Sequence, residues 1–282
     1  MKLTRVGAIG AERPALIEDN GRFRDLSGVV ADIAGDVLNP NSLEKLRALD
    51  VTTLPLLPQD ARVGPAVGQI GKVICVGLNF RDHAKESGLP LPEQPILFMK
   101  ATTAICGPND DVKIPRGSIK TDWEVELGVV IGTVARDVPK ERALEFVAGY
   151  LVVNDLSERA FQLEHGGQWV KGKSCDTFGP LGPMLVTADE ISDPQSLAMW
   201  LEVNGHRYQN GNSADMIFGV AHLVSYISRY MTLMPGDVIS TGTPAGVGLG
   251  QKPPKYLKAG DIVELGIEGL GRQRQRLVET QG

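Results

Sequence analysis

One segment, Asp122-Trp123-Glu124-Val125-Glu126-Leu127-Gly128-Val129-Val130-Ile131-Gly132, has the pattern of a β-strand, because it is rich in β-branched and apolar residues and ends at glycine. It nevertheless carries Glu124 and Glu126. Side chains alternate across a strand, so both carboxylates point to one face, with Val125 and Leu127 on the other. Two like charges repel, and a hard divalent cation is the simplest partner that makes the pair favourable. The plainer alternative is a solvated strand face with two unrelated glutamates.

Composition describes an ordinary globular protein of 282 residues, with 42% hydrophobic and 22% charged residues. The formal net charge of -5 gives no reason to expect a nucleic-acid or anionic-membrane partner. No apolar run is long enough for a membrane span or a signal-peptide core. Cys75, Cys106 and Cys175 form no CxxC pair, which is typical of reduced thiols. We therefore expect a cytoplasmic protein.

The chain divides into a small N-terminal unit and a larger second unit. Residues 1–60 are predicted to form a small α+β domain, with a β-hairpin around Asn20-Gly21 and a helix within 42–49. Residues 61–71 are rich in glycine and proline and are interpreted as a linker. Residues 72–282 then form the main domain.

Strands outnumber helices in this main domain. We predict a strand-rich α+β fold without internal repeats. The expected strands cover 72–78, 122–132, 149–154, 199–203, 237–240, 261–267 and 273–278, and the expected helices cover 80–86, 140–146 and 216–230.

A third carboxylate follows the next apolar strand, which ends at Asn154-Asp155-Leu156. Asp155 could complete an oxygen-ligand site with Glu124 and Glu126. Three carboxylates suit Mg²⁺, Mn²⁺ or Ca²⁺, and the lack of clustered histidine or cysteine argues against zinc. The alternative is that Asp155 caps the helical turn that follows it.

A short predicted helix carries His83 and Glu86, with Asn79 as its N-cap and Gly88 as its stop. Residues three apart are neighbours on a helix. A carboxylate beside an imidazole fixes its tautomer, which makes the pair a candidate general base for water. The alternative is an exposed polar pair without function.

Residues 167–174 match the P-loop pattern GxxxxGK[ST] literally. That motif needs a buried strand before it and a helix after it, whereas polar residues precede this segment and prolines follow it. We therefore expect no nucleotide partner, and retain Lys173 as a candidate cation beside the acidic residues. The glycine-rich residues 246–250 are too weak a signal for a dinucleotide site.

Taken together, these pieces resemble the fumarylacetoacetate hydrolase family over about residues 71–275, in order and in spacing. The segments that carry the resemblance are Gly77-Leu78-Asn79-Phe80, His83-Ala84-Lys85-Glu86, Pro95-Ile96-Leu97-Phe98-Met99-Lys100, Asp122-Trp123-Glu124-Val125-Glu126-Leu127, Asn154-Asp155-Leu156-Ser157-Glu158-Arg159, Lys171-Gly172-Lys173-Ser174, Gly179-Pro180-Leu181-Gly182-Pro183, Pro235-Gly236-Asp237 and Thr241-Gly242-Thr243-Pro244. The resemblance implies a mixed β-sandwich or β-roll, a small N-terminal domain and a homodimer.

The same resemblance implies a role for each matching residue. Its metal ligands correspond to Glu124, Glu126 and Asp155, which would hold Mg²⁺ or Mn²⁺. Its water-activating dyad corresponds to His83 and Glu86.

Further matches surround the metal ligands. Lys173 matches a catalytic lysine near the metal, Arg159 and Gln162 match residues that stabilise developing negative charge, and Thr243 matches a contact to a substrate carboxylate. Lys100 matches a residue of the substrate pocket, and Thr177 a threonine near the metal.

The implied activity is hydrolysis of a carbon–carbon bond in a 2,4-dioxo acid of the acylpyruvate type. A 2,4-dioxo-3-deoxy sugar acid of the fuconate or rhamnonate type is one such substrate. Three alternatives stay open: a decarboxylase or isomerase on the same fold, a ureidoglycolate lyase, and a metal-binding module without activity. Turnover and product analysis distinguish these alternatives.

Overall fold

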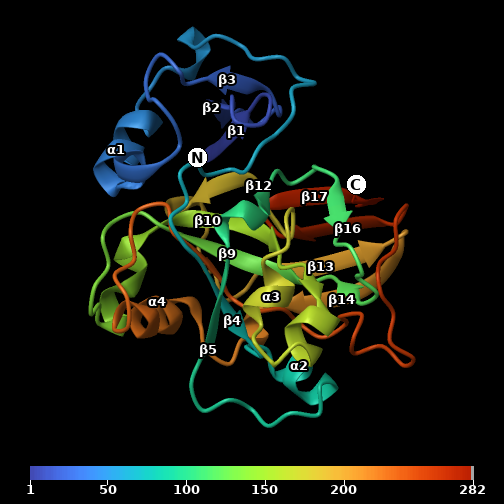
Figure 1. The fold of residues 1–282 in the computed structure, drawn as a ribbon. Coiled ribbons are helices and arrows are strands. Elements are labelled where there is room, and N and C mark those ends of the chain that lie inside the picture. The colour runs from blue at the N-terminus through green and yellow to red at the C-terminus, as the bar shows by residue number, and fades with distance from the viewer. Residues whose placement is uncertain (281–282) are drawn as a thin grey trace.

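The computed structural model describes residues 1–280, which form two packed sheets with short helices around them (Figure 1). The larger sheet has the order β3-β2-β1-β12-β10-β9-β15-β4-β5, and β6 pairs with β12. Its strands are β1 (Lys2–Val6), β2 (Arg13–Ile17), β3 (Phe23–Asp25), β4 (Val73–Gly77), β5 (Ile96–Lys100), β6 (Ile105–Cys106), β9 (Val125–Ile131), β10 (Val147–Asn154), β12 (Gly179–Thr187) and β15 (Val238–Ser240).

The second sheet has the order β14-β13-β16-β17-β7 and packs against the first. Parallel pairs join β15 to β4, β12 to β6 and β17 to β7, while the other pairs are antiparallel. The predicted strand-rich mixed fold is confirmed. The remaining strands are β7 (Val112–Ile114), β13 (Ala198–Val203), β14 (His206–Asn212), β16 (Ile262–Ile267), β17 (Gly271–Glu279) and a separate pair of β8 (Thr121–Asp122) with β11 (Ser157–Glu158).

Strand β9 lies in the middle of the larger sheet and is buried on both faces. Val125 and Leu127 belong to the main apolar core, which they share with Leu201 of β13. Val130 faces the other way and packs with residues of the N-terminal unit. The alternation predicted from the sequence is therefore present, and it leaves Glu126 on the face opposite the main core.

The N-terminal unit continues the larger sheet, because β1 pairs antiparallel with β12. Its hairpin of β2 and β3 forms as predicted, and Gly21 in the turn has the positive φ of 83° that favours glycine. Leu3 and Leu26 pack in one cluster with Leu151 of β10. The unit therefore shares a core with the main domain, above which it lies in Figure 1.

The linker between the units is held by ion pairs. Arg62 Nη1 lies 2.9 Å from Glu12 of the N-terminal unit, and Arg62 Nη2 lies 2.6 Å from Asp110 of the main domain. The hydrogen bond with Asp110 raises the pKa of Arg62; burial opposes this, and Glu12 adds to the rise. The predicted linker thus fastens the two units to each other.

Helices are short, and some differ from the predicted ranges. The helix expected within 42–49 begins two residues earlier, because the Asn39 side chain caps it at Ser42 N. The helix expected over 216–230 has only nine residues, Val220–Ser228. No helix within residues 1–280 is long and apolar enough to cross a bilayer. The helices are α1 (Pro40–Arg47), α2 (Arg81–Glu86), α3 (Val170–Lys173), α4 (Val220–Ser228), a π-helix (Ala160–Glu164) and 3-10 turns at Gly35–Leu38, Val51–Thr53, Thr102–Ala104, Lys140–Phe146, Ala188–Glu190 and Ser213–Asp215.

Asn79 does not cap α2, so that prediction was wrong. Phe80 occupies the cap position without a side-chain bond. The Asn79 amide instead donates to the Thr241 and Phe218 carbonyls, and its oxygen accepts from Phe218 N. Gly88 ends the helix with a φ of 66°, as expected.

Candidate active site

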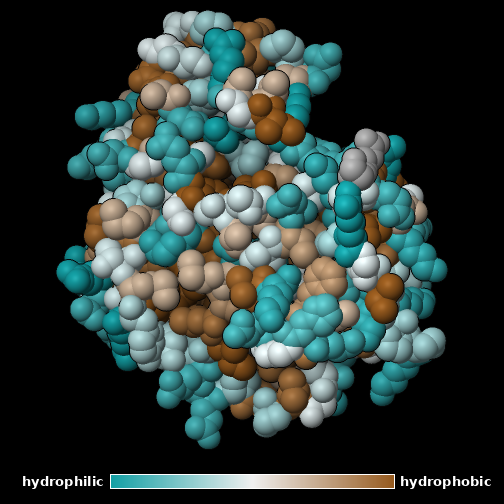
Figure 2. All heavy atoms as spheres, viewed as in Figure 1, coloured by the Kyte–Doolittle hydropathy of each residue, from teal (hydrophilic) through white to brown (hydrophobic). Residues whose placement is uncertain are grey.

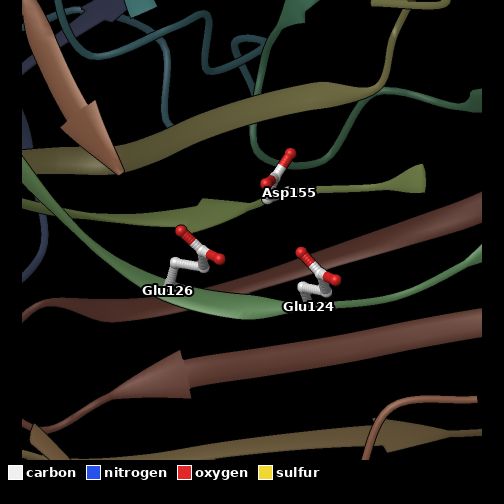
Figure 3. A group of neighbouring side chains, drawn as sticks. All are labelled: Glu124, Glu126 and Asp155. Carbon is white, nitrogen blue, oxygen red and sulfur yellow. The ribbon is translucent and has the colours of Figure 1, made fainter. Parts of the chain in front are cut away.

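Three carboxylates meet where β9 begins and β10 ends. Ligand oxygens of Glu124, Glu126 and Asp155 all lie within 4.8 Å of one another, and the three residues are buried. The antiparallel pairing of β9 with β10 places Val125 opposite Asn154, which brings Asp155 to the two glutamates. Figure 3 shows both glutamates projecting from one side of β9 beside Asp155.

Two of these carboxylates are paired with buried cations. Lys173 Nζ lies 2.6 Å from Glu124 Oε2 and 2.8 Å from Asp155 Oδ2. Arg159 Nη2 lies 2.6 Å from Glu124 Oε1, and Lys100 Nζ lies 2.5 Å from Asp155 Oδ1. Both carboxylate oxygens of Asp155 accept from lysines, so the alternative that Asp155 caps a helical turn is wrong.

Glu126 has only uncharged partners. Ser240 Oγ and Gly242 N donate to its Oε2 at 2.6 and 2.9 Å, and no cation of residues 1–280 forms an ion pair with it. Burial, followed by the charges of Asp155 and Glu124, raises the pKa of Glu126 well above its usual range. Burial opposes the charge of Glu124 too, but Lys173 and other cations lower its pKa to about 2.

This donor set fits a hard divalent cation. All three groups offer oxygen, their oxygens are close enough to share one ion, and one carboxylate still lacks a positive partner. Mg²⁺ and Mn²⁺ prefer such ligands. Glu124, Glu126 and Asp155 would hold the ion.

His83 and Glu86 form the expected dyad on α2. His83 Nδ1 lies 3.3 Å from Glu86 Oε2, and Glu86 Oε1 accepts from Gly246 N at 3.0 Å. A carboxylate only accepts hydrogen bonds, so Nδ1 carries the hydrogen and Nε2 is left to accept a proton. Both residues line a cavity of about 530 Å³ that Glu124 and Glu126 also line.

Most of the residues that were predicted to contact the substrate do line this cavity. Lys173, Arg159, Gln162 and Thr243 line it. Arg159 Nη1 donates to Gln162 Oε1 at 3.0 Å. This bond joins the N-cap residue of the π-helix to a residue within it. Thr243 donates its hydroxyl hydrogen to Val125 O at 2.9 Å, and its oxygen accepts from Gln209 Nε2 at 2.7 Å.

Lys100 and Thr177 depart from the expectation, since neither lines the cavity. Lys100 is 2% exposed at the end of β5, and its Nζ bonds Asp155 and the Leu156 carbonyl. Lys100 therefore neutralises the Asp155 carboxylate without lining the cavity. The Thr177 hydroxyl accepts from Lys113 N.

Asp122 belongs to the site although the sequence assigned it no role. It is fully buried, and its Oδ2 accepts from Arg159 Nε at 2.8 Å and from Leu249 N at 3.0 Å. Gly248 N donates to its Oδ1 at 2.6 Å. The amides of the glycine-rich loop 246–250 thus bind the protein's own carboxylates.

Residues 167–174 do not form a P-loop. A π-helix precedes the segment, and its only helix is the four-residue α3. Lys173 at the end of α3 faces the carboxylates, as expected of the candidate cation.

The sequence model described as the C-terminal region of fumarylacetoacetate (FAA) hydrolase matches residues 72–278, most of the chain. The chain belongs to the fumarylacetoacetate hydrolase family. A Burkholderia multivorans protein, named only as a hydrolase, is 62% identical over 276 residues, 98% of each chain.

Solved structures share the fold of this family member. The 5-carboxymethyl-2-hydroxymuconate delta-isomerase of Mycobacterium smegmatis is 33% identical, with a TM-score of 0.79 and all of both chains covered. The maleylpyruvate hydrolase of Sphingobium sp. SYK-6 was solved with manganese(II) and pyruvate. It is 26% identical, with a TM-score of 0.83 over all of both chains. The likeness thus extends to a hydrolase and an isomerase.

Proposed function

We propose that this protein is a divalent-metal-dependent hydrolase that cleaves a carbon–carbon bond in a 2,4-dioxo acid of the acylpyruvate type. The products would be pyruvate and a carboxylic acid. One observation carries the proposal: the His83–Glu86 pair lines the same cavity as Glu124 and Glu126. A site that only stored a cation would not need a base for water beside it.

A bound Mg²⁺ or Mn²⁺ would supply Lewis-acid chemistry at the 2-oxo acid end of the substrate. Two of the protein's own cations, Arg159 and Lys173, each pair with one oxygen of Glu124. Lys173 and Arg159 are charged, buried and at the cavity wall, so they stabilise negative charge that develops on the substrate. Thr243 lines the cavity and would bind the substrate carboxylate by turning its hydroxyl hydrogen from the Val125 carbonyl to the substrate.

The His83–Glu86 dyad would supply the base for the proposed reaction. His83 Nε2 takes a proton from water, and the water oxygen forms a bond to the C4 carbonyl carbon. The C3–C4 bond then breaks, and its electron pair stays on C3 as the enolate of pyruvate. The proton held by His83 returns to C3, so atoms and charge balance, and Glu86 keeps the imidazole in the required tautomer.

An isomerase is the second candidate, because a 33% identical protein of this fold carries that name. Isomerisation also moves a proton through a base, but it adds no water. A decarboxylase would release CO₂ from a β-oxo acid and leave the same kind of enolate. Mass spectrometry of the products separates the three reactions, since hydrolysis alone gives two fragments and consumes water.

The test compares His83→Ala and Glu86→Gln with the wild type under Mn²⁺. We expect both variants to lose at least about 100-fold in kcat, because general-base catalysis contributes that much or more. His222→Ala is the matched control, as His222 lies on α4 outside the cavity lining. Wild-type turnover in both dyad variants would overturn the proposal.

A further inference from the structure

One side of the active-site cavity is an aromatic wall. Phe98 and Trp169 both line the cavity and pack edge to face with ring centroids 5.3 Å apart. Lys173 Nζ lies 5.1 Å from the centre of the Phe98 ring. Phe98 therefore lies beside the lysine that pairs with the carboxylates, and Trp169 packs against Phe98.

Three exposed leucines line the same cavity. Leu89, Leu163 and Leu249 are 49%, 47% and 38% exposed, and they come from three separate segments of the chain. Single exposed apolar side chains are common on proteins, but several that meet at one cavity mark a binding surface. Figure 2 shows apolar residues among hydrophilic ones on the face that carries α2 and α3 in Figure 1.

The backbone under the wall is arranged for large apolar side chains. A Cβ at Gly77 would overlap the Trp169 ring, so glycine makes the space that the indole fills. The next residue, Leu78, has a φ of 52°, a conformation that strains any residue with a Cβ. Leu78 nevertheless places a large side chain on the cavity lining. Strain at an apolar wall residue indicates a local function.

We propose that the substrate carries an apolar group, aromatic or branched alkyl, on its C4 carbonyl, and that Trp169, Phe98 and the three leucines bind this group. The inference rests on the proposed function, since it describes the part of the substrate beyond the 2,4-dioxo acid. A polyhydroxylated chain would leave hydroxyls without partners against this wall. The structure thus favours an apolar acylpyruvate over the 2,4-dioxo-3-deoxy sugar acids.

Gln251 and Lys252 also line the cavity and could bind a second carboxylate instead. The experiment therefore compares kcat/KM for four acylpyruvates, whose C4 groups are methyl, phenyl, a polyol chain and a carboxyl-ended chain. We expect the phenyl compound to exceed the methyl compound by at least about 10-fold, because each buried methylene is worth about four-fold. Preference for the polyol or carboxyl-ended compound would overturn the inference.

Substitutions in the cavity lining test which residues bind the apolar group. Trp169→Ala and Leu163→Ser should reduce the phenyl-to-methyl ratio of kcat/KM by about 10-fold and about four-fold, respectively. Leu144→Ser is the matched control, because Leu144 is 44% exposed but does not line the cavity, and its ratio should equal that of the wild type. An unchanged ratio in both cavity variants would contradict the assignment.

Binding separates failure of the inference from failure of the proposed function. Calorimetry with Mn²⁺ present gives the Kd of pyruvate and of phenylpyruvate without any turnover. Tighter binding of phenylpyruvate, weakened in Trp169→Ala, supports the apolar subsite even if no acylpyruvate is cleaved. Equal Kd values overturn the subsite even if acylpyruvates are cleaved.

Discussion

Asp122→Asn should destabilise the protein strongly, because the substitution keeps the shape of the side chain but replaces one oxygen that accepts two hydrogen bonds. Oδ1 accepts from Trp123 N and Gly248 N, and Oδ2 accepts from Arg159 Nε and Leu249 N. Whichever oxygen is replaced by the amide nitrogen, two buried donors then face another donor.

The magnitude follows from these contacts. A buried donor without its acceptor costs about 1–3 kcal/mol, and removing one partner of a buried ion pair costs about 3–5 kcal/mol. We therefore expect the free energy of unfolding to fall by about 3–5 kcal/mol. Arg159 also bonds Glu124 at 2.6 Å, so its displacement should lower kcat by at least about 10-fold.

Urea unfolding followed by circular dichroism measures the change. The matched control is Asp111→Asn, which breaks an ion pair with Arg276 between side chains that are 45% and 58% exposed. An exposed pair contributes less than about 1 kcal/mol. If Asp122→Asn were also within about 1 kcal/mol of the wild type, Asp122 would not be the anchor that we describe.

Three further predictions concern the metal site, a glycine and the thiols. Mn²⁺ at 100 times its Kd should stabilise the wild type by about 2.7 kcal/mol, and a thermal melt of Glu126→Gln should show little of that gain; an equal gain would exclude Glu126 as a ligand. Gly172→Ala should lose at least about 2 kcal/mol, because its Cβ would overlap the Glu158 carbonyl and Gln162 N, whereas Gly28→Ala has open space; equal urea midpoints would contradict this. Burial raises the pKa of Cys175 to about 11, and those of Cys75 and Cys106 are raised as well, so all three thiols stay protonated at pH 8. Iodoacetamide should therefore label the native protein slowly and the unfolded protein at all three cysteines. Rapid labelling of the native protein would refute this.

Local sequence rules predicted much of the site. The two-residue period of a strand put Glu124 and Glu126 on one face, and the three-residue spacing on a helix brought His83 to Glu86. Asp155 was within reach because consecutive apolar strands commonly pair, as β9 and β10 do. These features depend on short stretches of chain, so their geometry follows from spacing.

Features that depend on distant partners could not be predicted. Asp122 bonds Arg159, 37 residues away, and Gly248, 126 residues away, and no local pattern marks either contact. Asn79 has the composition of a helix cap, but the Thr241 carbonyl from a distant strand end takes its amide. Tertiary contacts overrode the local preference in both cases, and the same holds for Lys100 behind Asp155.

The most direct test of the central claim is product analysis of one acylpyruvate by mass spectrometry, with Mn²⁺ and again with EDTA. A metal-dependent hydrolase gives equal amounts of pyruvate and a carboxylic acid with Mn²⁺ and neither product with EDTA. Release of CO₂, or an isomer of unchanged mass, would show that the carboxylates and the dyad serve another reaction.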